Sequence, residues 1–168
     1  MIQVYTGDGK GKTTASLGLL IRNAGHGQRS CLIQFMKKGY DYGELKILRQ
    51  IKNLELFLFG TPELVDPVNP KPIDLAEADK ALKKCQQVLA CNKYNLIVLD
   101  EINVAVKWGL ISLKDQMKLT EISTESEVIM TGRYAEPKLL ERADLVTIMK
   151  SYKHYFDKGI PARKGIEF

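Results

Sequence analysis

The sequence is poor in the residue types that build metal centres and disulfide frameworks. Its 168 residues include three cysteines, two histidines and one tryptophan. Cys31, Cys85 and Cys91 form no Cys-x-x-Cys pair, and no histidine stands at the spacing of a zinc site. Because an odd number of cysteines without a disulfide framework suits a reducing compartment, we expect a cytoplasmic protein.

Long apolar runs and blocks of like charge are also missing. No segment approaches the roughly 18 apolar residues that cross a bilayer. The chain opens on strand-like residues from Ile2, so we expect no signal peptide. The 25 basic and 20 acidic residues are scattered and leave a net charge of +5. This pattern predicts no nucleic-acid or membrane partner, and it fits either a solvated basic surface or a weak field that attracts anionic ligands.

Short apolar runs alternate with helical patterns along the chain, which predicts one α/β domain, 1–168. The sheet is expected to be mostly parallel, with about six strands and helices on both faces. The predicted strands are Ile2–Thr6, Ser30–Met36, Leu54–Phe59, Asn95–Asp100, Glu127–Gly132 and Asp144–Lys150. The predicted helices are Thr13–Gly25, Asp74–Cys91, Ser112–Ile122 and Glu136–Ala143.

A glycine-rich turn between the first strand and the first helix is the most informative motif. It reads TGDGKGKT, and the usual phosphate-binding pattern has glycine where this chain has Thr6. Backbone N–H groups from Gly7 to Thr13 can surround phosphate oxygens, and the helix N-terminus adds positive partial charge. Lys12 adds a full charge, and the Thr13 hydroxyl is a ligand for Mg²⁺. The alternative is an accidental glycine-rich turn.

A second motif supports the first. The apolar run LIVLDE ends in Asp100 and Glu101. Carboxylates at the carboxyl end of a strand in a nucleotide-binding sheet hold the metal directly or through water. The alternative is a strand that happens to end in acidic residues. Together the two motifs predict a P-loop NTPase (RecA-like) architecture that binds a nucleoside triphosphate with Mg²⁺ or Mn²⁺.

Phosphate binding alone does not identify the reaction. The only candidate for a GTPase base-reading motif, NKYN at Asn92–Asn95, lacks its aspartate and precedes a strand. The arginines are too dispersed for the lid of a small-molecule kinase, and no Ser/His/Asp or Cys/His arrangement stands out. Another P-loop ATPase or kinase that forms ADP, or a non-catalytic nucleotide-binding protein, therefore stays open.

Several segments together resemble the P-loop cobalamin (corrinoid) adenosyltransferase family, from Ile2 to Phe168. They are YTGDGKGKTTASLGLLIRNAGHG, QFMKKG followed by GE, LIVLDEINVAVKWGLI, VIMTGR and KHYFDKGIPARKGIEF. The resemblance implies transfer of the 5′-deoxyadenosyl group of ATP to the Co(I) of a reduced corrinoid, with release of triphosphate. Because Co(I) is itself the nucleophile, such a protein needs no base and instead stabilises the leaving group.

The resemblance also implies roles for individual residues. Lys12, Thr13 and Glu101 are the expected catalytic residues, and Thr13, Glu101 and Asp100 the expected metal ligands. The expected nucleotide-binding residues are Gly7, Asp8, Gly9, Lys10, Gly11, Lys12, Thr13, Thr14, Arg22 and Arg133. For Arg133, a surface salt bridge is the alternative. The resemblance further implies a homodimer and an electron-donating flavoprotein partner.

Two features depart from the family pattern. Several members have a helical extension before the first strand that covers the substrate, whereas here the first strand begins at Ile2. Some members carry Phe and Trp after the glycine of the middle loop, whereas FGTPELVDP has no Trp after its glycine. The prolines of Thr61–Pro72 exclude a helix or a central strand. We expect this long loop to handle the corrinoid differently.

The remaining candidates are one tryptophan and two histidines. We expect Trp108 to pack in the core. His26 is expected to cap the first helix and His154 to pack the C-terminal tail, with a cobalt-ligand role as the alternative for both.

Overall fold

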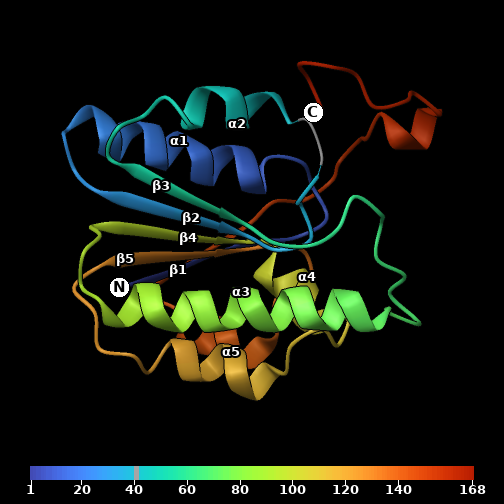
Figure 1. The fold of residues 1–168 in the computed structure, drawn as a ribbon. Helices are drawn as coiled ribbons and strands as arrows, with labels where there is room; N and C mark the ends of the chain where they lie inside the picture. The colour runs from blue at the N-terminus through green and yellow to red at the C-terminus, as the bar shows by residue number, and fades with distance from the viewer. Residues whose placement is uncertain (40–41) are drawn as a thin grey trace.

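The computed structural model describes residues 1–39 and 42–168, which build a parallel six-stranded sheet (Figure 1). The strands are β1 Ile2–Thr6, β2 Ser30–Gln34, β3 Leu54–Leu58, β4 Leu96–Asp100, β5 Glu127–Thr131 and β6 Leu145–Ile148. They pair in the order β3-β2-β4-β5-β1-β6, and every pair is parallel. The predicted α/β class is confirmed. The second strand ends two residues before the predicted Met36, which has a positive φ of 58°.

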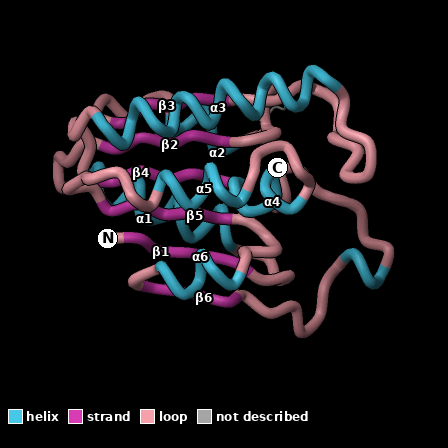
Figure 2. The backbone as a smooth tube through the Cα atoms, turned by 90° about the horizontal axis from the view of Figure 1, so that it is seen from below, coloured by secondary structure: helices cyan, strands magenta, loops and turns pink. Residues whose placement is uncertain are grey.

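Helices cover both faces of the sheet. They are α1 Lys12–Gly25, α2 Gly43–Leu48, α3 Pro72–Ala90, α4 Ile102–Lys107, α5 Leu113–Leu119 and α6 Pro137–Arg142, with a 3-10 turn at Phe156–Lys158. In Figure 1, α1 and α2 lie above the sheet and α3, α4 and α5 lie below it. Figure 2, viewed from below, shows α3, α5 and α6 side by side over the lower face. The pattern did not predict α2 or α4.

Each face of the sheet has its own apolar core because side chains alternate along a strand. Val4 and Leu99 belong to the core between the sheet and helices α3, α4, α5 and α6. Leu32 and Val98 belong to the core between the sheet and helices α1 and α2, where they pack with Leu20. Full burial of such a side chain stabilises the fold by about 1.5–3 kcal/mol. These two cores fix the helices against the sheet and hence the loops at its carboxyl edge.

Strand order places the two sequence motifs at the same edge of the sheet. Only β5 separates β1, which leads into the glycine-rich loop, from β4, which ends at Asp100. Because all six strands are parallel, their carboxyl ends meet along one edge. The loop between β1 and α1 therefore lies within side-chain reach of the carboxylates after β4.

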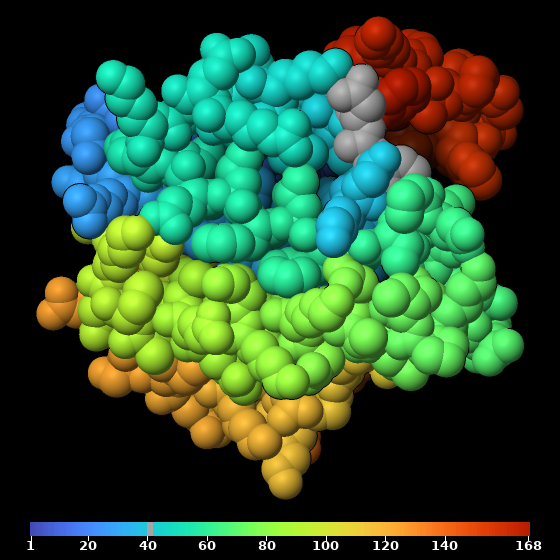
Figure 3. Space-filling view, viewed as in Figure 1, coloured from blue at the N-terminus to red at the C-terminus, as the bar shows by residue number. Residues whose placement is uncertain are grey.

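The segment after β6 runs along the glycine-rich loop. The Met149 N–H donates to Thr6 O at 2.8 Å, and the Gly9 N–H donates to Met149 O at 2.8 Å. Gly7 has a φ of +101°, and a Cβ on it would lie 2.3 Å from the Met149 oxygen, so position 7 requires glycine. Figure 3 shows the rest of the C-terminal segment, in red, gathered at one corner of the molecule. Among the residues described, no helix combines the length and apolar character needed to cross a bilayer.

Candidate functional site

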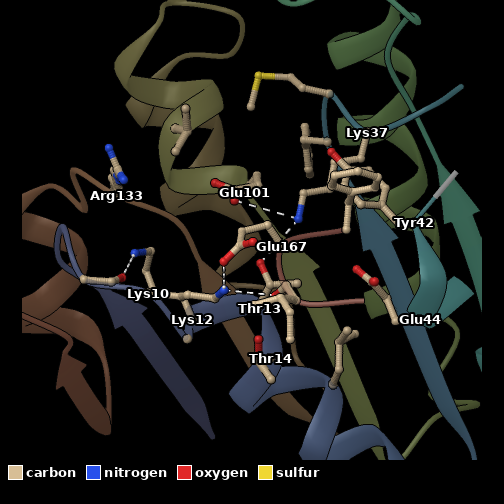
Figure 4. A pocket seen from close by; sticks show the side chains of 18 of the residues that line it. Lys10, Lys12, Thr13, Thr14, Lys37, Tyr42, Glu44, Glu101, Arg133 and Glu167 are labelled. Carbon is tan, nitrogen blue, oxygen red and sulfur yellow. Dashed lines mark hydrogen bonds and ion pairs between the residues drawn. The ribbon is translucent and has the colours of Figure 1, made fainter. Parts of the chain in front are cut away.

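A cavity of about 900 Å³ opens above the glycine-rich loop (Figure 4). Segments far apart in the sequence line it: the loop itself, the residues after β2, the loop after β3, the start of α4 and the C-terminal tail. Its floor carries Lys12, Thr13 and Glu101, while Leu64 and Trp108 give it an apolar part. It is large enough for a drug-sized or cofactor-sized ligand.

Lys12 is buried within its own loop. Its Nζ donates hydrogen bonds to Gly7 O at 2.7 Å and to Gly9 O at 2.6 Å. Burial, and then the positive charge of Arg133, lower the pKa of Lys12. Neutral carbonyls are weaker partners for an ammonium than an anion is, so the loop presents a buried positive charge that a phosphate group would stabilise.

Asp100 is fully buried at the end of β4 and accepts hydrogen bonds at both oxygens. Thr131 Oγ1 donates to Oδ1 at 2.6 Å, and Thr13 Oγ1 lies 3.0 Å from the same oxygen. Oδ2 accepts from Gln34 Nε2 at 2.9 Å and from Lys37 Nζ at 2.8 Å. Burial alone would raise the pKa of Asp100, but the charge and hydrogen bond of Lys37 outweigh it and lower that pKa.

Glu101 follows directly and turns its carboxylate toward the cavity. Its φ of 64° is left-handed, and it is the residue that caps α4. Its backbone N–H donates to Thr131 Oγ1 at 3.1 Å, which holds this turn in place. Burial, together with the neighbouring negative charge of Asp100, raises the pKa of Glu101. A cation in the cavity would relieve both effects.

Lys37 belongs to the site, although the sequence pattern indicated no role for it. Its Nζ lies 2.8 Å from Asp100 Oδ2, 3.8 Å from Glu101 Oε1 and 3.3 Å from Thr13 Oγ1. The expected strand register could have pointed to Lys37 from the sequence. Lys37 follows the second predicted strand, so a parallel register that pairs Gln34 with Asp100 would bring its side chain to the carboxylates.

The structure brings most of the predicted site residues together. Those that line the cavity are Gly9, Lys10, Gly11, Lys12, Thr13, Thr14, Glu101 and Arg133, with Asp100 buried behind them. Gly7 forms the base of the loop, where its carbonyl accepts from Lys12. Asp8 faces the C-terminal segment, since its Oδ1 accepts from the Ser151 N–H at 3.1 Å.

Arg22 is not brought to the cavity. It lies in the last turn of α1, ten residues beyond Lys12, and its side chain is exposed. Because an α-helix rises 1.5 Å per residue, this places its backbone about 15 Å along the helix from the loop. Arg22 is not one of the described residues that line the cavity.

Lys10 turns toward the C-terminal tail. Its Nζ donates to Glu167 Oε1 at 2.8 Å and to Ile166 O at 2.9 Å. Arg163 pairs with the same carboxylate at 3.2 Å. The hydrogen bonds from Arg163 and Lys10 lower the pKa of Glu167 to about 2. The tail is thereby tied to the glycine-rich loop at the rim of the cavity.

The aromatic and histidine candidates divide between core and cavity. Trp108 is half-buried, packs against the lower core and also lines the cavity, so its expected place in the core is only part of its environment. His154 lines the cavity and accepts at Nδ1 from the Phe156 N–H at 3.1 Å. His26 stands at the C-terminal end of α1, as predicted, with its backbone N–H directed at that helix.

The sheet and the loop define a class of protein. A parallel sheet whose first strand runs into a Gly-Lys-Thr loop, with an Asp-Glu pair two strands away, is the arrangement of a P-loop nucleotide-binding protein of the RecA-like type. A KaiC-like protein from Pyrococcus horikoshii OT3 shares this fold with a TM-score of 0.58 at 14% identity, covering 91% of this chain and 73% of that one.

The particular family follows from comparison over the full chain. A family model described as ATP:corrinoid adenosyltransferase BtuR/CobO/CobP matches residues 1–168. The corrinoid adenosyltransferase of Pseudomonas aeruginosa is 35% identical over 171 residues, which cover 100% of this chain and 83% of that protein. That of Escherichia coli K12 is 32% identical over 169 residues, covering 100% and 85%. The chain therefore belongs to the ATP:corrinoid adenosyltransferase family and is an enzyme of that class. The predicted family is confirmed and favoured over an ADP-forming or non-catalytic P-loop protein.

Proposed function

We propose that the cavity holds Mg²⁺–ATP with its triphosphate in the glycine-rich loop, as the leaving group of an adenosyl transfer to a reduced corrinoid. The observation that carries this is the convergence of Lys12, Thr13 and Glu101 on one cavity that also has an apolar part. In the step, the Co(I) electron pair attacks C5′ of ATP, the C5′–O bond breaks, and triphosphate leaves with the bonding electrons. No proton moves, so the protein's task is to hold C5′ and stabilise the developing negative charge.

The donor set suits a hard divalent cation. The Thr13 hydroxyl, the Asp100 carboxylate and the Glu101 carboxylate lie together and offer only oxygen. Within residues 1–39 and 42–168, no group of three or more His, Cys, Asp or Glu side chains forms a complete cage. Mg²⁺ is usually held by one or two carboxylates together with substrate phosphates, and Mn²⁺ accepts the same ligands. Such an ion would supply charge neutralisation of the triphosphate.

The test of the reaction is ³¹P NMR of the products formed from Mg²⁺–ATP with chemically reduced cobalamin, and without it. We expect tripolyphosphate, and only when Co(I) is present. The control is cobalamin left unreduced, which should give none. ADP and inorganic phosphate formed regardless of cobalamin would show ordinary phosphoryl transfer and would overturn the proposal.

Glu101→Gln is expected to raise the Mg²⁺ concentration needed for half-maximal transfer by about tenfold or more, because it removes a charged ligand. The matched control is Glu44→Gln, since Glu44 lines the same cavity from α2. Transfer rates measured across a Mg²⁺ titration check this. Identical titration curves for Glu101→Gln and wild type would remove Glu101 from the metal site.

The loop after β3 contributes, together with Trp108, the apolar part of the cavity on which we place the corrinoid. Leu64 lines the cavity although 88% of its surface is exposed, and Val65 packs from there onto the lower core. An exposed leucine at the rim of a cavity is available to contact a ring that enters from solvent. That Thr61–Pro72 handles the corrinoid differently from relatives with an aromatic pair stays a prediction.

Leu64→Asp is accordingly expected to raise the KM for cobalamin at least about tenfold while changing the KM for ATP less than twofold, because lost apolar contact affects one substrate only. Val68→Asp is the matched control: Val68 is on the same loop, is 91% exposed and is not among the described residues of the cavity. Steady-state kinetics with each substrate varied check this. Equal changes in both KM values would make the loop structural.

The remaining assignments concern the setting of the enzyme. We propose that residues 1–168 act as one domain, that the enzyme is a homodimer, and that a flavoprotein in the cytoplasm delivers the electron that produces Co(I). The apolar side chains of edge strand β6 support a dimer, since Leu145, Val146 and Ile148 are 38–56% exposed. The three free cysteines suit a reducing compartment. Light scattering after gel filtration tests the dimer.

A further inference from the structure

Lys37 lies where the proposed metal would bind. Its Nζ is within 4 Å of Thr13 Oγ1, Asp100 Oδ2 and Glu101 Oε1, the three side chains assigned to the cation. Its side chain is only 14% exposed, so water screens these contacts weakly. The structure therefore holds a protein cation on the same oxygens that suit Mg²⁺.

The hydrogen bonds of Asp100 leave little room for a second cation. Thr131 and Thr13 occupy Oδ1, and Gln34 and Lys37 occupy Oδ2. A magnesium ion binds oxygen at about 2.0–2.1 Å and repels a neighbouring ammonium. Of these partners, Lys37 alone carries a positive charge like that of the metal. Binding of the metal therefore requires the Lys37 ammonium to leave Asp100 Oδ2.

The cavity gives the Lys37 side chain space for a second position. It lines the cavity, and its ammonium lies 5.6 Å from the centre of the Tyr42 ring on the cavity wall. A lysine has a flexible four-carbon stem, so its ammonium can swing without backbone movement. Thr13 Oγ1, 3.3 Å away, belongs to the loop proposed to hold the triphosphate. A short movement toward that loop would exchange carboxylate partners for phosphate oxygens.

We propose that Lys37 is an exchangeable cation: it fills the metal position in the free enzyme and moves onto the triphosphate when metal and nucleotide enter together. This inference rests on the metal site proposed above. Metal alone must displace Lys37 from Asp100 without offering it a new anion. Metal with triphosphate supplies that anion, so each ligand strengthens binding of the other. The exchange would keep the buried Asp100 carboxylate and the partly exposed Glu101 carboxylate neutralised at every stage.

The test is Mn²⁺ binding measured by EPR on nucleotide-free wild type, Lys37→Met and Lys37→Gln. We expect Lys37→Met to bind free Mn²⁺ about tenfold or more tightly than wild type, because the competing charged hydrogen bond is gone. In the presence of ATP that advantage should vanish or reverse, since wild type then gains a lysine–phosphate contact. Lys38→Met is the matched control, as the exposed Lys38 pairs with Glu77 at 3.8 Å, and it should bind like wild type.

Two readings separate this inference from the function on which it rests. If Glu101→Gln leaves Mn²⁺ binding in the presence of ATP unchanged, the metal site itself is wrong. If Glu101→Gln weakens it, yet both Lys37 variants bind free Mn²⁺ like wild type, the exchange is wrong. Lys37→Gln keeps a hydrogen-bond donor for Asp100 in case Lys37→Met folds poorly. In wild type, NMR of ¹⁵N-labelled lysine ammonium groups should show the buried signal shift on addition of Mg²⁺–tripolyphosphate, and an unmoved signal would overturn the exchange.

Discussion

Replacing Lys12 by alanine is expected to slow adenosyl transfer by about 10²–10³-fold, the loss typical of removing one group that stabilises developing negative charge. Triphosphate gains charge as the C5′–O bond breaks, and the Lys12 ammonium is buried in the loop beneath it. Because the same group also binds ground-state ATP, we expect KM for ATP to rise as kcat falls. Single-turnover formation of the Co–C bond, followed by absorbance, measures the chemical step directly.

Lys10→Ala is the matched control for Lys12→Ala. Lys10 is in the same loop, but its ammonium pairs with Glu167 and its side chain is 44% exposed. We expect Lys10→Ala to lose less than tenfold, because its charge is directed at the tail and is screened by solvent. Similar losses in both variants would show that general positive charge matters and would contradict a specific role for Lys12.

The features that sequence predicted well were those with a local pattern. The strands around Val4 and Val98 are apolar runs that fit a sheet covered on both faces, and the glycine-rich turn needs only its own residues to be recognised. The six-residue helices α2 and α4 were missed, because fewer than two helical turns give weak periodicity. The equally short α6 was predicted, and it has a proline, Pro137, at its first position as a start signal.

What the sequence could not supply was distance between segments. The Lys37–Asp100 pair spans 63 residues and depends on the register of β2 against β4. The Lys10–Glu167 pair spans 157 residues and depends on where the tail returns. Arg22 was assigned to the nucleotide by resemblance, whereas it lies in the last turn of α1 and is not among the described residues that line the cavity. Each of these is decided by tertiary packing, which a single sequence does not display.

Asp100→Asn is expected to lower the free energy of unfolding by about 3–5 kcal/mol, the usual cost of breaking a buried ion pair from one side. The substitution keeps the shape of the side chain but leaves the Lys37 ammonium, on a side chain that is 14% exposed, with Glu101 at 3.8 Å as its remaining charged partner among the described residues. Urea unfolding measures the loss. Asp79→Asn is the control, because its pair with Lys83 is exposed on α3 and is expected to contribute less than about 1 kcal/mol.

The pH dependence of that difference checks its cause. The pKa of Asp100 is lowered in the folded state, so its stabilisation is complete above its usual value of 3.8 and is lost as the pH falls through the lower folded pKa. Burial lowers the pKa of Lys37, but the charges of Asp100 and Glu101 outweigh burial and raise it. The contribution of Lys37 to stability is therefore complete below its usual pKa of 10.5 and is lost as the pH rises through the higher folded pKa. The gap between wild type and Asp100→Asn should therefore be largest from about pH 5 to pH 9 and should shrink toward both extremes. A gap that stays constant as the pH falls through the acid range would mean that packing, and not the buried ion pair, accounts for the role of Asp100 in stability.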